Sequence, residues 1–317
     1  SRMSKARNIS ALSTVEAGAT TDQTKADIDA LGINGFNKNW VINGGFDIWQ
    51  RSTSAAQTNG GFVADRWKGN NYVNGTFTFS KRTDATGQTF KTYGRLAQSS
   101  AGSQGARQGI VHFIEGNYLV GKTITVSFKA RANAALTGCI VRGIIANQTF
   151  NLTTSFVKHS FTATALAEGA NTRLMFDFGL ENTTWYVDIA EVQVEVGSVA
   201  TDFEHRSYGE EFALCQRYYE QTVNLTGVSG GITLMAFNTA NGVQGLHFDV
   251  RKRAAPTVVL YGRSGVANTI SYITTGGVVT GCAAQTITAD GCHYISVGAT
   301  LSAGGGYEIH YSADAEL

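Results

Sequence analysis

Aromatic residues beside asparagines are the feature of this sequence best suited to chemistry with a ligand. Sugar recognition needs aromatic faces that stack on C–H groups, together with fixed polar groups that bind hydroxyls. Both occur here near turns, where a β-sandwich exposes its loops. The aromatic set is Trp67, Tyr72, Tyr118 and Trp185, and the amide set is Asn70, Asn71, Asn117 and Asn182. As a set they indicate glycan binding, and for each residue alone the alternative is core packing or a plain turn.

The acidic residues and histidines do not form a catalytic pattern. Glycosidases hold two carboxylates about 5–10 Å apart, whereas Glu191 and Glu195 share a strand face at a spacing of about 13 Å, which suits solvated charges at a sheet edge. No G-x-S-x-G, H-E-x-x-H or Walker loop is present. The six histidines are scattered, and although His310 could meet its copies on a three-fold axis and bind a metal ion, we do not expect a metal site there. We therefore expect a protein that is not an enzyme.

The composition indicates an all-β protein. Charged residues are 15% of the chain, against roughly 25% in an average soluble domain, and the 317 residues include 37 Gly, 17 Phe, 12 Tyr and a single Pro. Such a chain favours strands over helices. A net charge of +1 argues against binding to nucleic acid or to an anionic membrane. No apolar run approaches the roughly 18 residues of a membrane span.

Four cysteines, Cys139, Cys215, Cys282 and Cys292, are widely spread and form no C-x-x-C motif. Only Cys282 and Cys292 are placed to bridge, across a hairpin. Free buried thiols are the expected state, as in a protein assembled in a reducing cytoplasm.

The window of residues 41–67 holds a turn that leads into a strand. Asn43-Gly44 is a turn dipeptide, and the residues after it alternate between apolar and polar. Four charged residues of the window are expected to form charge-assisted hydrogen bonds at the edge of an aromatic core: Asp47, Asp65, Arg51 and Arg66. The alternative for this window is a folding nucleus without a binding role.

Residues 40–206 as a whole are predicted to form a β-sandwich of the jelly-roll kind. Apolar residues recur at every second position, as in Ile124, Val126, Phe128 and Ala130. After Trp185 the alternation changes phase, while its period of two residues is kept on both sides of the change. This pattern predicts a β-bulge near Ala190-Glu191.

Residues 207–317 are predicted to form a linking helix and a second, smaller β-sandwich. Ser207-x-x-Glu210 is a capping box, and helical spacing continues to residue 221. Strand patterns then return, and Pro256 marks a strand start or edge. The run Arg251–Arg253 is expected to be a solvated strand end. Gly-rich strands leave apolar surface uncovered, so we expect subunits to associate through this part.

Residues 1–39 form a polar N-terminal arm. Thr20-x-x-Gln23 can cap a short helix that ends near Gly32 and has only Ile28 and Leu31 as an apolar face. A helix this short needs a partner. The arm is either an attachment and oligomerisation segment or a disordered tail.

Four groups of residues together resemble tail-fibre and related receptor-binding proteins of bacteriophages and prophages. The resemblance covers about residues 40–317 in scattered blocks, and the start Met3–Asn8 is similar to the starts of small structural proteins of marine phages. The blocks are Asn43–Arg51 with Ala64–Trp67, Asp188–Gly197 with Ala200–Glu204, Glu211–Tyr219, and Ala313–Leu317.

Two shorter stretches, Asn43–Asp47 and Trp185–Asp188, resemble jelly-roll carbohydrate-binding modules. Those modules often hold a structural calcium ion where the first and last strands meet. The resemblance implies Asp47 and Asp188 as side-chain ligands, with backbone carbonyls completing an oxygen shell. The alternative is that Asp47 pairs with Arg51 or caps a turn.

The phage resemblance implies a virion structural protein, made in the host bacterial cytoplasm and assembled as a homotrimeric tail fibre or similar appendage. Its arm would contact other virion proteins, its jelly roll would bind host cell-surface polysaccharide, and its last sandwich would hold the subunits together. Several weak sites would then engage one cell surface at once. Two alternatives are a capsule depolymerase with acids contributed across a subunit interface, and a capsid or tail decoration protein without a ligand.

Overall fold

The computed structural model describes residues 38–57, 61–71, 77–101, 107–167, 169, 171–180, 183–222, 231–236, 242–302 and 304–317. Residues 41–317 form one compact unit. The predicted arm and its short helix lie outside the described residues, apart from the end of the arm. No helix in the described part of the chain is both long enough and apolar enough to cross a membrane.

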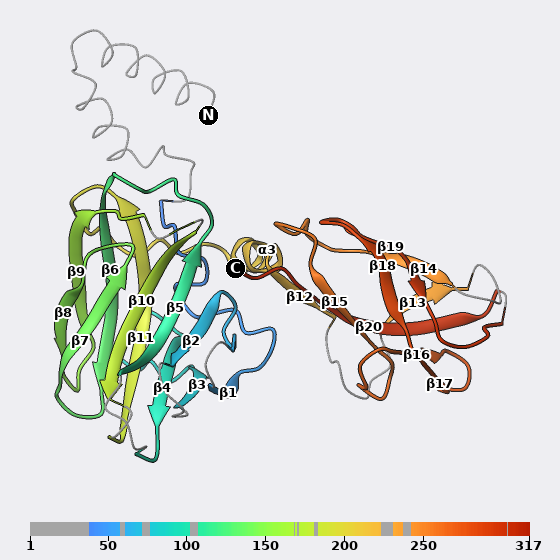
Figure 1. Cartoon of the computed structure of the whole chain (residues 1–317). Helices are drawn as coiled ribbons and strands as arrows, with labels where there is room; N and C mark the ends of the chain where they lie inside the picture. Colours follow the sequence, from blue (N-terminus) through green and yellow to red (C-terminus); the bar gives the residue numbers. More distant parts are fainter. Residues whose placement is uncertain are drawn as a thin grey trace, which may run out of the picture. The chain divides into compact units, whose positions relative to one another are not determined.

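The first β-body consists of two antiparallel sheets, as predicted for residues 40–206 (Figure 1). One sheet has six strands in the order β1-β3-β4-β11-β6-β9, and the other has five in the order β2-β5-β10-β7-β8. The six are β1 (Ser54–Gln57), β3 (Phe77–Arg82), β4 (Tyr93–Gln98), β11 (Trp185–Val196), β6 (Thr123–Ala132) and β9 (Val157–Thr164). The five are β2 (Trp67–Asn71), β5 (Arg107–Ile114), β10 (Thr172–Leu180), β7 (Leu136–Gly143) and β8 (Gln148–Leu152).

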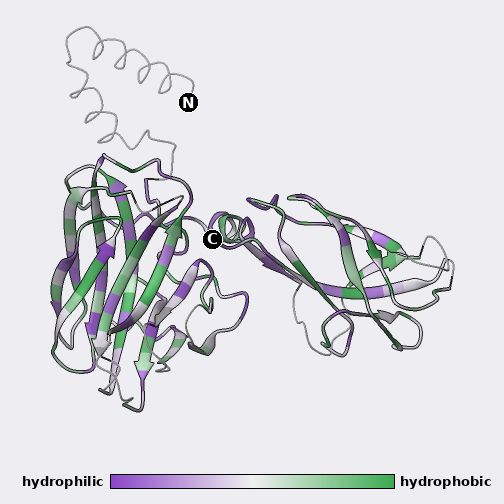
Figure 2. Ribbon diagram, viewed as in Figure 1, coloured by the Kyte–Doolittle hydropathy of each residue, from purple (hydrophilic) through white to green (hydrophobic). Residues whose placement is uncertain are grey.

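The core of this jelly-roll body follows the predicted alternation. Ile124, Val126, Phe128 and Ala130 of β6 are all buried, and the Phe128 ring meets the Phe176 ring of the opposite sheet edge-on at 4.9 Å. Alternating colours along the strands of Figure 2 show the same two-residue period. Burial of these side chains between two sheets is the main stabilising term of the body.

The predicted β-bulge in β11 is confirmed. The register of β11 against β6 shifts between Ala190 and Gln193, and Glu191 takes a left-handed backbone with φ of 50°. A positive φ is uncommon for a residue other than glycine. The extra residue keeps Val187 before the bulge and Val192 and Val194 after it in the core.

The linking helix α3 (Tyr208–Gln216) starts where the sequence predicts it. Ser207 is its N-cap, and the Ser207 hydroxyl accepts a hydrogen bond from the Glu210 amide at 3.3 Å. The helix ends earlier than predicted, because Tyr219 begins strand β12 (Tyr219–Gln221). The aromatic pair Tyr218 and Tyr219 therefore belongs to the entry into the second β-body and not to a helical face.

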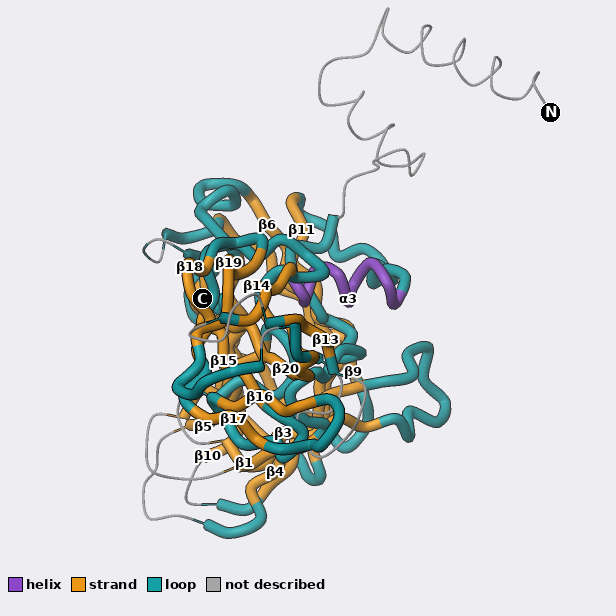
Figure 3. Tube along the Cα trace, turned by 90° about the vertical axis from the view of Figure 1, so that its right-hand side faces the viewer, coloured by secondary structure: helices purple, strands orange, loops and turns teal. Residues whose placement is uncertain are grey.

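The C-terminal body is organised around one long strand, β20 (Gly306–Asp314). β20 pairs with β12 and β13 (Ile232–Met235) along one edge and with β15 (Thr257–Tyr261) and β16 (Thr269–Tyr272) along the other. Figure 3 shows β13, β15 and β16 around β20. β17 (Val278–Thr280) extends this sheet, and β14 (Val243–His247), β19 (Gly291–Ser296) and β18 (Ala283–Ile287) form a second one. Within the described residues, no strand before Ser207 pairs with a strand after it. The second sandwich is confirmed, and Pro256 directly precedes β15.

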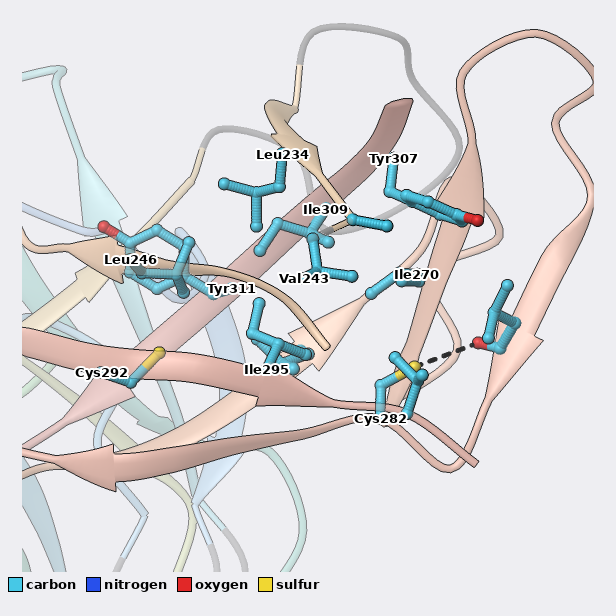
Figure 4. Close-up of a cluster of buried hydrophobic side chains, with 14 of the residues drawn as sticks. Leu234, Val243, Leu246, Ile270, Cys282, Cys292, Ile295, Tyr307, Ile309 and Tyr311 are labelled. Atoms are coloured by element: carbon cyan, nitrogen blue, oxygen red, sulfur yellow. Dashed lines mark hydrogen bonds between the residues drawn. The ribbon is translucent and has the colours of Figure 1, made fainter. Parts of the chain in front are cut away.

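The core of the C-terminal body is apolar and holds two cysteines (Figure 4). Tyr307, Ile309 and Tyr311 of β20 are buried in it. All four cysteines of the chain are buried and free, so the expected free thiols are confirmed and the alternative Cys282–Cys292 bridge is not formed. The Cys282 thiol instead donates to the Val279 carbonyl at 3.4 Å.

Two polar residues of this body are buried, and one of them corrects a sequence prediction. Lys252 is only 1% exposed, and its ammonium group lies 2.5 Å from a Glu220 carboxylate oxygen and 2.7 Å from the Gln216 carbonyl. The prediction that residues 251–253 are a solvated strand end is therefore wrong at Lys252, because the Glu220 carboxylate compensates its charge inside the body. His310 is also buried within its own subunit, and its Nδ1 lies 3.3 Å from the Thr222 hydroxyl. That location does not suit a metal site shared between subunits.

Candidate ligand-binding cleft

The residues predicted to bind glycan do not form one site. Trp67 and Trp185 are buried; the Trp67 indole donates to the Asn43 carbonyl at 2.9 Å, and the Trp185 ring packs near Phe77. Both therefore belong to the core. Tyr118 is 70% exposed on the loop between β5 and β6. Tyr72 and Asn182 lie outside the described residues, as does the side chain of Asn71.

The predicted calcium pair, Asp47 and Asp188, does not fit a metal site. Both carboxylate oxygens of Asp188 accept hydrogen bonds from guanidinium groups, from Arg95 at 2.6 and 2.8 Å and from Arg131 at 2.8 Å. The Asp47 carboxylate accepts from the Thr92 hydroxyl. Among the described residues, no three His, Cys, Asp or Glu side chains come close enough to hold a metal ion. The Asp188 oxygens are used by ion pairs that link three adjacent strands.

The arginines of the first window do not pair with its aspartates. Arg66 pairs with Glu316, and Arg51 pairs with Asp314 at 3.1 Å. Asp65 instead accepts from the backbone amide and the side-chain amide of Gln50, each at 2.7 Å. Charge-assisted bonds do form in this window, but their acids come from the end of the chain.

The turn at Asn43 is built by the side chain of that residue. The Asn43 amide group donates to the carbonyls of Ile48 and Asp65 at 2.8 and 2.9 Å, and its oxygen accepts from the Ile48 amide at 3.0 Å. Asn43 also has a positive φ of 58°, which asparagine tolerates better than most residues. These bonds fix the path of the chain into Gly44 and Gly45.

Gly44 lies directly against the bulge of β11. The Val192 amide donates to the Gly44 carbonyl at 2.9 Å, and a Cβ atom at Gly44 would overlap the Val192 carbonyl oxygen. The same Cβ would lie 3.4 Å from the Phe203 ring. Glycine is required here because a side chain would collide with the backbone of Val192.

Beside this contact, the outer face of the six-stranded sheet is hollowed into a cleft. Its two parts have volumes of about 340 and 200 Å³, and both are lined by Thr89, Glu191, Phe203 and His205. Lys129 of β6 and Lys158 of β9 lie in the larger part, and Asp47 and Lys91 in the smaller. The loop before β4 forms one wall, and the segment after β11 forms the other.

The floor of the cleft carries a fixed network of hydrogen bonds. The bulge residue Glu191 pairs with the Lys129 ammonium at 2.9 Å and accepts from the Thr89 hydroxyl at 3.3 Å. Lys129 also donates to the Thr89 hydroxyl at 3.0 Å. A backbone outlier that carries a charged side chain into a cleft is a frequent mark of a binding site.

Two polar residues of β11 hold the second wall in place. Gln193 accepts from the Glu204 amide at 2.9 Å, and Glu195 accepts from the amide and hydroxyl of Thr201 at 2.9 and 2.8 Å. Both side chains are buried, with Glu195 only 4% exposed. The expectation that Glu191 and Glu195 are solvated charges at a sheet edge is therefore wrong. β11 is a central strand, and the segment that follows it covers its polar face.

Phe203 is the aromatic residue of this wall. Its ring packs near the backbone of Gly44 and Gly45 and meets the His205 ring edge-on at 5.0 Å. Phe203 was not among the predicted aromatic residues because no asparagine accompanies it. Gln193 and Glu195, which alternate with valines, could have indicated this wall. Once they are buried they need polar partners, and the segment that holds Phe203 supplies them.

The cleft thus combines an aromatic ring with carboxylates, ammonium groups, hydroxyls and an imidazole. Such a set can stack on the C–H face of a ring and hydrogen-bond to its hydroxyls. Lys158 donates to the Thr201 carbonyl at 2.7 Å with one of its three N–H groups, so its other N–H groups can donate to a ligand.

A scan against protein-family models gave no match, and neither did a search of curated proteins. Among solved structures, a CBM4 structure is 21% identical, with 50% of this chain and 99% of that chain covered and a TM-score of 0.35. The N-terminal cellulose-binding domain of Cellulomonas fimi β-1,4-glucanase C is 16% identical, with 49% and 95% covered and a TM-score of 0.30. The enzymatically active domain of bacteriophage CBA120 tailspike protein 4 is 16% identical, with 50% of this chain but 22% of that chain covered and a TM-score of 0.34. At these values the similarities say nothing about ligand or activity.

Proposed function

We propose that this chain is a structural protein of a bacteriophage virion, part of a tail fibre or similar appendage, which binds a host cell-surface glycan during adsorption. The cleft on the six-stranded sheet is the proposed binding site. The protein acts by adhesion and not by catalysis, as a homotrimer whose N-terminal arm contacts other virion proteins.

One observation carries the proposal: two of the sequence blocks that resemble phage tail-fibre proteins meet at the cleft. The block Asn43–Arg51 contributes Gly45 and Asp47 to its lining. The block Asp188–Gly197 with Ala200–Glu204 contributes Glu191, Asp202 and Phe203, together with the buried side chains that hold the wall. Blocks separated by about 140 residues in sequence thus build one surface feature.

The test is glycan binding by the Phe203→Ala variant on an array of bacterial surface oligosaccharides. Loss of a stacking ring in a sugar site is expected to weaken binding about tenfold or more. Tyr118→Ala is the matched control, since Tyr118 is an exposed aromatic residue outside the cleft, and it should bind as the unaltered protein does. The opposite result, with binding lost in Tyr118→Ala alone, would move the site to the β5–β6 loop.

Two further measurements separate the proposal from its alternatives. Reducing ends released from host polysaccharide would identify a depolymerase in place of an adhesin. A protein that binds no glycan and does not compete with phage adsorption would be a decoration protein. Labelled antibody on intact virions tests the expected location at an appendage.

A further inference from the structure

The balance of charges in the cleft bears on which class of glycan it accepts. Its lining includes three ammonium groups, from Lys91, Lys129 and Lys158, and three carboxylates, from Asp47, Glu191 and Asp202. A sugar carboxylate or sulfate that entered would meet as many like charges as opposite ones. Like charges brought together away from bulk water disfavour binding of a ligand. An uncharged hydroxyl faces no such repulsion and can both donate and accept.

The central pair of the cleft is already neutralised within the protein. The Lys129 ammonium and the Glu191 carboxylate lie 2.9 Å apart, and Thr89 bonds to both. An anionic sugar group would have to compete with Glu191 for Lys129, which costs the energy of a partly buried ion pair. A sugar hydroxyl can bind this pair without separating it, by donating to Glu191 and accepting from Lys129.

Guanidinium groups, which recognise carboxylate and sulfate best, are not available in the cleft. None of the described residues that line it is an arginine. The arginines on the same face of the sheet, Arg95 and Arg131, are both engaged by Asp188. The guanidinium groups that could bind the carboxylate of an acidic sugar are thus already paired with a carboxylate of the protein.

From these observations we infer that the cleft selects uncharged, hydroxyl-rich glycans, and that the Glu191–Lys129 pair determines this specificity. The inference rests on the proposed glycan-binding function and adds the substrate class to it. Glu191 is placed for this role by the bulge, whose left-handed residue turns a carboxylate of a central strand into the cleft.

The experiment compares linear oligosaccharides of equal length, uncharged hexoses against uronates, by titration calorimetry with the full chain. The unaltered protein should bind the uncharged series at least tenfold more tightly, roughly. Glu191→Gln keeps the side-chain size but frees Lys129 and leaves the cleft with an excess positive charge. It is expected to lose about tenfold for the uncharged probe and to gain affinity for the uronate.

The reciprocal variant and a control make the test specific. Lys129→Gln should lose affinity for the uncharged probe without any gain for the uronate. Arg251→Gln breaks an exposed ion pair of the C-terminal body, formed with Asp290 at 2.8 Å, and should leave both affinities unchanged. Preference of the unaltered protein for uronates, lost in Phe203→Ala, would overturn this inference while keeping the proposed function. Absence of binding to any glycan would overturn both.

Discussion

The two β-bodies bury polar groups for different purposes. In the C-terminal body, the Lys252 ammonium and the Tyr311 hydroxyl both donate to the Glu220 carboxylate inside the fold, and all three residues belong to segments that the body needs for its own closure. In the jelly-roll body, Gln193 and Glu195 face outward from a central strand and hold the segment 201–204 over the sheet. The first arrangement compensates charges in an interior. The second arrangement shapes a surface.

This difference separates polar residues that close the fold from polar residues that shape the proposed binding cleft. Removing a member of the C-terminal network should lower stability and leave ligand binding intact. Substitutions at the contact between Gly44 and the β11 bulge should weaken binding at the proposed cleft, even where they lower stability less than changes in the C-terminal network do. Three variants test this distinction.

The largest effect is expected for Lys252→Met in the C-terminal body. The change leaves the Glu220 carboxylate, 1% exposed, without its cation, and breaking a buried ion pair typically costs about 3–5 kcal/mol. Chemical denaturation measures the loss in the free energy of unfolding. Arg251→Met removes a cation that is exposed and should cost less than about 1 kcal/mol. Altered glycan binding in Lys252→Met would contradict the separation of roles.

The next effect is a pH dependence that arises from Asp65 in the jelly-roll body. Burial raises the pKa of Asp65 to about 6, against partial opposition from its bond with the Gln50 amide. The folded state therefore keeps a proton that the unfolded state releases near pH 4, so this group favours folding at low pH. Its contribution is lost as the pH rises through about 6, and amounts to on the order of 3 kcal/mol.

Asp65→Asn removes this titration and is the variant that measures it. The free energy of unfolding of Asp65→Asn minus that of the unaltered protein should increase from pH 4 to pH 7, because only the unaltered protein loses the Asp65 contribution. A difference that stays constant over that range would show that Asp65 is not the titrating group. Asp290→Asn, at an exposed acid of the C-terminal body, serves as the control and should show no comparable change.

The smallest effect on stability, with a clear effect on binding, is expected for Gly44→Ala. The added methyl group would overlap the Val192 carbonyl oxygen, and overpacking of this kind costs about 1–3 kcal/mol. Because the collision displaces the bulge, binding at the cleft should weaken as well. Gly209→Ala in α3 has open space around the new methyl group and should be neutral or stabilising by up to about 1 kcal/mol. Unchanged binding in Gly44→Ala would show that the turn at Gly44 does not determine the shape of the cleft.

The strands, the bulge and the helix start could be predicted because each depends on neighbouring residues. Alternation predicted which face of β6 is buried, and a change of phase within β11 predicted a bulge near Ala190-Glu191, where the register shifts between Ala190 and Gln193. Ser207 and Glu210 are three residues apart, so their cap was visible in the sequence. The end of α3 was missed because strand pairing of Tyr219 with Asp314 overrides the helical spacing.

The site was harder to predict, because its residues depend on contacts between distant segments. Trp67 and Trp185 stand next to asparagines as exposed sugar-binding residues do, yet the sheets close over both. The acids that pair with Arg51 and Arg66 lie about 250 residues further along the chain. Gln193 and Glu195 among the valines of β11 indicate a need for polar partners but do not identify the segment that supplies them, although the resemblance block Ala200–Glu204 contained Phe203, which lines the cleft.

The central position of β20 has a consequence for synthesis of the chain. Four strands of the C-terminal body, β12, β13, β15 and β16, have β20 as a pairing partner, and β20 leaves the ribosome after all of them. Until it emerges, these strands carry open edges that other chains can join. Each newly made chain therefore exposes unpaired strand edges until β20 emerges and closes the sheet.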